Sequence, residues 1–142
     1  MSARFSAPVV KATAYYQASI ERWRDAKCLH EAERFQGAIY LCGYAVECYL
    51  KFCYCVSRRV TGIEVHKAKR LGHELVELLD AAGYSRLLIE ERDLHLAFQR
   101  ISDRWSTSIR YSGGAGTARE SERFLRDSMD LLLWLKKMAS KS

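Results

Sequence analysis

Hydrophobic residues recur at three- and four-residue intervals along most of the chain, a spacing typical of amphipathic helices. The first such stripe starts at Val9 and contains no strand-like alternation. Pro8 stands just before it, where a proline can open a helix because its missing N–H is not needed in the first turn. We therefore predict a long helix that begins near Pro8 and ends between His30 and Phe35.

The most apolar stretch, Phe35 to Val56, is predicted to form a central, mostly buried helix. It is long enough to suggest a membrane span, but it contains Glu47 and Lys51, and each charge near a bilayer centre costs about 2.5–3.5 kcal/mol. Because the two residues are four apart with the glutamate first, they can pair along one helix face. The alternative is that both face a polar ligand at a dimer cleft.

Three more helical segments follow. The pattern predicts a short helix over residues 75–82 with Gly83 as its C-cap, and another helix over residues 87–105. The residues Thr117-Ala-Arg-Glu120 form a capping-box signature that opens the last helix. No repeat or linker-like composition interrupts the chain. We expect one all-α domain over residues 1–142, an antiparallel up-down bundle of four to five helices.

The composition is that of an ordinary globular protein of 142 residues, with 23 Lys and Arg against 17 Asp and Glu. Five cysteines occur without a Cys-x-x-Cys pair, so we interpret them as small buried hydrophobic residues and expect no metal and no cofactor. No charged-then-apolar signal sequence opens the chain. We therefore expect a cytoplasmic protein with reduced thiols and no membrane partner.

Most of the net charge of +6 lies between residues 58 and 73, which hold five basic side chains and one acidic side chain. We call this segment the basic connector, and its cations are Arg58, Arg59, Lys67, Lys69 and Arg70. One interpretation is a solvated loop. The other is a phosphate-binding patch for RNA, because clustered Lys and Arg supply salt-dependent affinity for the backbone.

A second candidate phosphate site surrounds the glycine-rich stretch from Arg110 to Thr117. This stretch lacks the spacing of a P-loop and can be a simple flexible connection. It also brings Arg110 and Tyr111 next to the start of the last helix, where free N–H groups favour anions. With Arg104 and Arg119 close in sequence, these four residues are the candidate phosphate ligands.

Three segments stand in order along the chain: Gly37-Ala-Ile-Tyr-Leu-Cys-Gly-Tyr-Ala-Val-Glu47-Cys-Tyr-Leu-Lys51, then Gly72-His73-Glu74-Leu75, and then Trp105-Ser-Thr-Ser-Ile-Arg110-Tyr111. Together they resemble the HEPN family of prokaryotic helical domains. The resemblance implies a helical bundle, frequent homodimers, and roles in toxin–antitoxin and defence systems. It also implies one of three activities: metal-independent RNase, nucleotide binding, or partnership with a small nucleotidyltransferase.

The RNases of this family carry an Arg followed, after four to six residues, by a His near the start of the last helical region. Here Arg104 is followed by Arg110, which cannot lose its proton and cannot act as a general base. The spacing also occurs from Arg59 to His66 in the basic connector. If the protein is an RNase, the candidate catalytic residues are Arg59 and His66 with Glu47 and Lys51.

Three functions stay open, and the sequence does not decide whether the protein is an enzyme. The first is a HEPN-like protein that binds nucleotide or RNA as a homodimer or beside a nucleotidyltransferase or antitoxin. The second is a metal-independent RNase toxin with a displaced active site. The third is a structural subunit that packs against another protein and has no ligand of its own.

Overall fold

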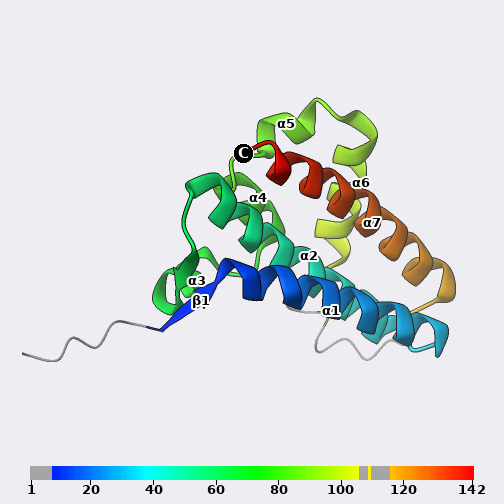
Figure 1. Ribbon diagram of the computed structural model, residues 1–142. Coiled ribbons are helices and arrows are strands. Elements are labelled where there is room, and N and C mark those ends of the chain that lie inside the picture. The colour runs from blue at the N-terminus through cyan, green and yellow to red at the C-terminus, as the bar shows by residue number, and fades with distance from the viewer. Residues whose placement is uncertain (1–7, 106–108, 110–115) are drawn as a thin grey trace, which may run out of the picture.

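The computed structural model describes residues 8–105, 109 and 116–142. It is 79% helical and includes one small two-stranded sheet (Figure 1). The elements in chain order are β1 (Val9–Lys11), α1 (Ala12–Glu31), α2 (Phe35–Arg58), β2 (Gly62–Glu64), α3 (Val65–Leu71), α4 (Leu75–Ala81), α5 (Ser85–Ile89), α6 (Arg92–Arg104) and α7 (Ala118–Ser140). The predicted helical character is confirmed. The predicted number of helices is wrong, because the described residues form seven, three of which have only five or seven residues.

Helix α2 is the core of the protein, as its apolar sequence predicts. Helices α1, α4 and α7 all pack against it (Figure 1), and most of its residues from Ala38 to Cys55 are buried. Among the described residues, α2 alone is long and apolar enough to cross a membrane. However, 72% of its most apolar window is buried inside the protein. Core packing therefore accounts for its hydrophobicity.

The first element of the described residues is a strand, so the prediction of a helix that begins near Pro8 is wrong. Strand β1 pairs antiparallel with β2, with Val10 opposite Ile63, and the Pro8 carbonyl accepts a hydrogen bond of 2.9 Å from the Val65 amide. The pairing buries Ile63, which is 2% exposed. At Gly62, a Cβ atom would lie 2.6 Å from the Val10 carbonyl oxygen, so glycine permits this close approach. Helix α1 starts only at Ala12.

Three later predictions differ in outcome. The single helix predicted over residues 87–105 is divided into α5 and α6, which are separated by Glu90 and Glu91. The capping box is confirmed, since the Thr117 hydroxyl accepts a hydrogen bond of 3.1 Å from the Glu120 amide at the start of α7. Gly83 has a φ of 85° just after α4, which is the left-handed conformation expected there.

Four of the five cysteines are buried, as predicted, and Cys28 is exposed, contrary to the prediction. Burial raises the pKa of the Cys42 and Cys53 thiols to about 12. These thiols therefore stay protonated at neutral pH and behave as small apolar side chains.

Candidate functional site

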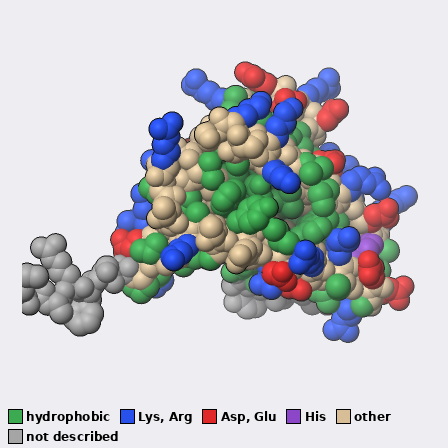
Figure 2. Space-filling view, viewed as in Figure 1, with side chains coloured by type: hydrophobic (Ala, Val, Ile, Leu, Met, Phe, Trp, Pro, Cys, Tyr) green, Lys and Arg blue, Asp and Glu red, His purple; other side chains and the backbone are tan. Residues whose placement is uncertain are grey.

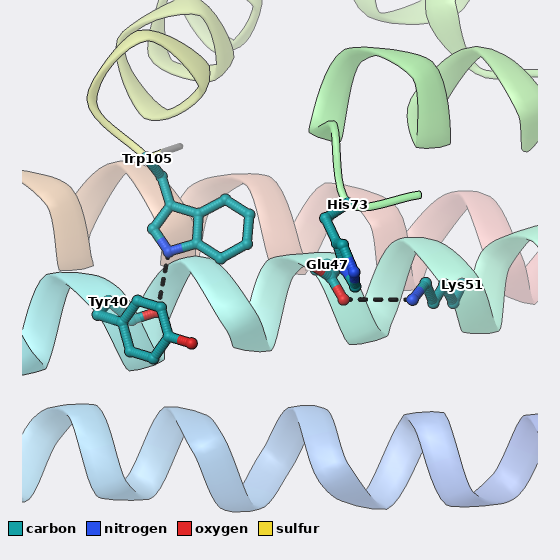
Figure 3. Close-up of polar contacts among 5 residues, drawn as sticks. All are labelled: Tyr40, Glu47, Lys51, His73 and Trp105. Atoms are coloured by element: carbon teal, nitrogen blue, oxygen red, sulfur yellow. Dashed lines mark hydrogen bonds and ion pairs between the residues drawn. The ribbon is translucent and has the colours of Figure 1, made fainter. Parts of the chain in front are cut away.

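Glu47 is a carboxylate buried in the middle of α2, with 1% of its side chain exposed. Each of its oxygens has its own partner (Figure 3): Lys51 Nζ lies 3.2 Å from Oε2, and His73 Nδ1 lies 3.0 Å from Oε1. The predicted pairing of Glu47 with Lys51 along one helix face is confirmed, and it occurs within one chain. We call Glu47, Lys51 and His73 the Glu47 cluster.

Lys51 has a second partner besides Glu47, the aromatic ring of Tyr15. Its ammonium nitrogen lies 5.7 Å from the centre of the Tyr15 ring on α1, and the side chain is 8% exposed. A cation over an aromatic face is attracted by the electrons of the ring. Burial raises the pKa of Tyr15, and the neighbouring Cys55 and Cys48 thiols raise it further, as does the Glu47 carboxylate. Tyr15 thus stays a neutral ring beside the ammonium.

His73 links this buried pair to the surface. It lies in the turn between α3 and α4, and its side chain is 51% exposed. The sequence pointed to it only as part of the segment Gly72-His73-Glu74-Leu75. In a neutral imidazole, the Nδ1 that faces a carboxylate carries the hydrogen and donates the hydrogen bond. Nε2 is then left as an acceptor. A histidine oriented in this way by a buried carboxylate can accept a proton from a bound molecule.

The basic connector consists of the end of α2, then β2, and then α3, so it is partly helical rather than a simple loop. Its five cations are all exposed, and none forms an ion pair within the described residues. Two of them meet at one ring: Arg58 Cζ lies 5.1 Å and Lys67 Nζ 5.5 Å from the centre of Tyr54. The fold therefore holds cations from α2 and α3 together without a carboxylate between them.

Glu47, Lys51, Tyr54 and Arg58 lie on one stripe of α2, because they are spaced by four, three and four residues. The stripe is about 16 Å long at 1.5 Å per residue. His73 contacts one end of it and Lys67 the other. The Glu47 cluster and the basic connector are thus neighbouring parts of one candidate site.

Arg59 and His66 are both exposed, and the described contacts include none between them. Arg59 ends α2 in the left-handed conformation, with a φ of 55°. The histidine that contacts Glu47 within the chain is His73. A catalytic role for Arg59 and His66 stays a prediction.

The second predicted phosphate site is only partly within the described residues, because Arg110 and Tyr111 lie outside them. Arg104 Nη2 donates a hydrogen bond of 2.9 Å to Gln36 Oε1 and lies 3.4 Å from Glu120 Oε2. Arg119 lines a groove between α6 and α7 together with both basic and acidic side chains: Arg100, Glu122, Arg123, Arg126, Asp127 and Asp130. Arg100 is held there by Asp127 through two hydrogen bonds of 2.9 Å. Since much of this positive charge is already neutralised, the basic connector is the stronger candidate for binding phosphate.

Trp105 docks on the same stripe of α2, nearer its start. Its indole N–H donates a hydrogen bond of 2.9 Å to the Tyr40 carbonyl (Figure 3), and the ring lies against Gly43. The side chain is 6% exposed, so Trp105 belongs to the core. Trp105 and His73, which belong to separate sequence segments, thus contact one face of α2.

No three His, Cys, Asp or Glu side chains gather into a metal-binding group within the described part of the chain. Comparison with family models, curated proteins and solved structures gave no match. The functional interpretation therefore depends on the geometry of the site itself.

Proposed function

We propose that the protein binds RNA or a nucleotide through the basic connector. The observation that carries this proposal is the convergence of Arg58 and Lys67 on the ring of Tyr54, with no acidic partner among the described residues. Within the described part of the chain both cations lack a counter-charge of their own, and a bound polyanion would supply it. Lys69 and Arg70, exposed at the end of α3, add to the positive field along which a phosphate backbone can lie.

The wider setting that we propose follows from the resemblance to the HEPN family. Trp105 and His73, from two of the three HEPN-like segments, contact α2, which carries the first. This supports a HEPN-like up-down bundle. On this proposal the protein works in the cytoplasm as a homodimer, in a bacterial toxin–antitoxin or defence-type system. A nucleotidyltransferase or an antitoxin is its candidate partner.

RNA binding is expected to be salt-dependent and to weaken when either cation at Tyr54 is removed. For fluorescein-labelled single-stranded RNA, the slope of log affinity against log salt should fall by about 1 in Arg58→Ala and in Lys67→Ala, and by about 2 in the double variant. Fluorescence anisotropy at four salt concentrations measures this slope. Competition by unlabelled nucleotide distinguishes a nucleotide ligand from an RNA.

The matched control for this titration is Lys141→Ala, which removes an exposed lysine outside the basic connector. It should leave the slope unchanged. The proposal is contradicted if RNA does not bind, or if all three single variants lower the slope equally.

A second candidate function is cleavage of the bound RNA without a metal ion, and the orientation of His73 by Glu47 favours it. In this reaction His73 Nε2 takes the proton of a ribose 2′-hydroxyl as that oxygen bonds to phosphorus. The bond from phosphorus to the 5′-oxygen of the next nucleotide breaks, and this oxygen takes a proton from water. The products are a cyclic phosphate end and a 5′-hydroxyl end.

If this second function is correct, the purified protein should cleave RNA in the presence of a chelator, and His73→Ala should slow cleavage by about 100-fold or more. His66→Ala is the informative comparison, because both histidines are exposed and both belong to the basic connector. Loss of cleavage in His66→Ala alone would support the Arg59 and His66 site instead. If the unsubstituted protein does not cleave RNA, binding is the only function left on this surface.

A further inference from the structure

An apolar groove lies between α1 and α7, on the face of the protein shown in Figure 2, where hydrophobic side chains gather in the middle of the surface. Its volume is about 270 Å³, and Tyr49 of α2 contributes to its lining. The side chains that form its two walls are Tyr16, Ile20 and Trp23 of α1 and Met129, Leu132 and Leu133 of α7. Leu133 is 58% exposed, far more than a leucine with only a core role.

The walls have the dimensions of a helix-binding groove. The α1 wall uses positions spaced by four and three residues, and the α7 wall runs from Met129 to Lys136. Each wall is about two helical turns, or roughly 10 Å, long. A docked amphipathic helix presents anchors at i, i+3 or i+4, and i+7, which cover the same length.

The charge around the groove indicates which kind of helix fits. Lys136 is the one charged residue among those that line it, and Lys27 lies one turn beyond Trp23 on α1. Both are exposed, and neither forms an ion pair within the described residues. The acidic residue beside Met129, Asp130, lines the groove between α6 and α7 instead. The rim is therefore basic, and a second copy would present the same lysines to it.

We propose that this groove binds an amphipathic helix of a different protein, whose apolar stripe is flanked by Asp or Glu. The apolar stripe supplies affinity, and the acidic flanks meet the lysines and supply selectivity. The groove shares no residue with the basic connector. Partner binding is thus a separate property from RNA binding.

The test uses two synthetic helical peptides of about 18 residues, a length at which helices begin to be stable. Both carry leucine at the i, i+3, i+4 and i+7 positions, and their flanks are Glu in one and Lys in the other. The Glu peptide should bind about tenfold more tightly in a fluorescence titration. Leu133→Glu should weaken it by about tenfold or more, and Lys136→Glu should remove the preference between the peptides, because the new carboxylate offsets the charge of Lys27.

The matched control is Ile89→Glu, which introduces the same charge at a residue of equal exposure, 60%, on α5. It should leave peptide binding unchanged, and circular dichroism should show all variants folded. The proposal is overturned if neither peptide binds, if both bind equally, or if Ile89→Glu acts like Leu133→Glu. It is also overturned if sedimentation shows a dimer that Leu133→Glu dissociates, because a second copy would then occupy the groove.

Discussion

Glu47→Leu alone and Lys51→Met alone are each expected to lower the free energy of unfolding by about 3–5 kcal/mol. Each substitution leaves the opposite charge buried without its partner, since the two side chains are only 1% and 8% exposed. Urea denaturation followed by circular dichroism measures the loss. For a protein of this size, a loss of that magnitude is a large part of the total stability.

The double variant Glu47→Leu/Lys51→Met is the decisive control. It removes both charges and replaces them with apolar side chains of similar volume, so its stability should lie within about 1 kcal/mol of the unsubstituted protein or exceed it. His73→Ala should cost about 1–3 kcal/mol, because it leaves one oxygen of the buried Glu47 carboxylate without its donor. A double variant whose loss equals the sum of the two single losses would contradict the coupling of Glu47 to Lys51.

The features predicted correctly from the sequence are those with a local signal. The apolar run identifies α2, Thr117 and Glu120 identify the start of α7, and the four-residue spacing of Glu47 and Lys51 identifies their contact. In each case the partners lie within one or a few helical turns. The spacing along the chain therefore determines the distance in space.

The features that were missed depend on residues far apart in sequence. Strand β1 has three residues, too few for a visible alternation, and it forms only because β2 lies beside it. His73 reaches Glu47 across 26 positions. A signal for this contact does exist: Lys51 can satisfy one oxygen of a buried carboxylate, so the other oxygen requires a second donor.

In the candidate site, too, the local feature is visible in the sequence, whereas the contact between distant residues is not. The concentration of positive charge between residues 58 and 73 is visible in the sequence, which contains no aromatic residue in that segment. The ring on which Arg58 and Lys67 converge belongs to Tyr54, which precedes the segment in α2. Only the docking of α3 near the end of α2 brings Lys67 to that ring. The composition therefore indicates a candidate ligand class, and the fold shows which cations lie together.

Gly43→Ala is expected to destabilise the protein by about 3 kcal/mol, although alanine is normally the better helix former. A Cβ atom at Gly43 would overlap the indole ring of Trp105, at atoms Cδ1, Nε1 and Cγ. The ring would have to move away, which would break its hydrogen bond to the Tyr40 carbonyl and expose a buried aromatic side chain. Thermal and urea unfolding measure the loss.

Gly37→Ala in the same helix provides the matched control. Its Cβ atom would lie 3.3 Å from Leu29 Cδ1, the tip of a flexible side chain that can shift slightly. The gain in helix propensity, up to about 1 kcal/mol, should then make this variant neutral or slightly stabilising. If Gly43→Ala loses no more stability than Gly37→Ala, then Trp105 does not hold the end of α6 against α2. Trp105→Leu combined with Gly43→Ala should cost less than the two single losses together, because the smaller side chain leaves room for the added methyl group.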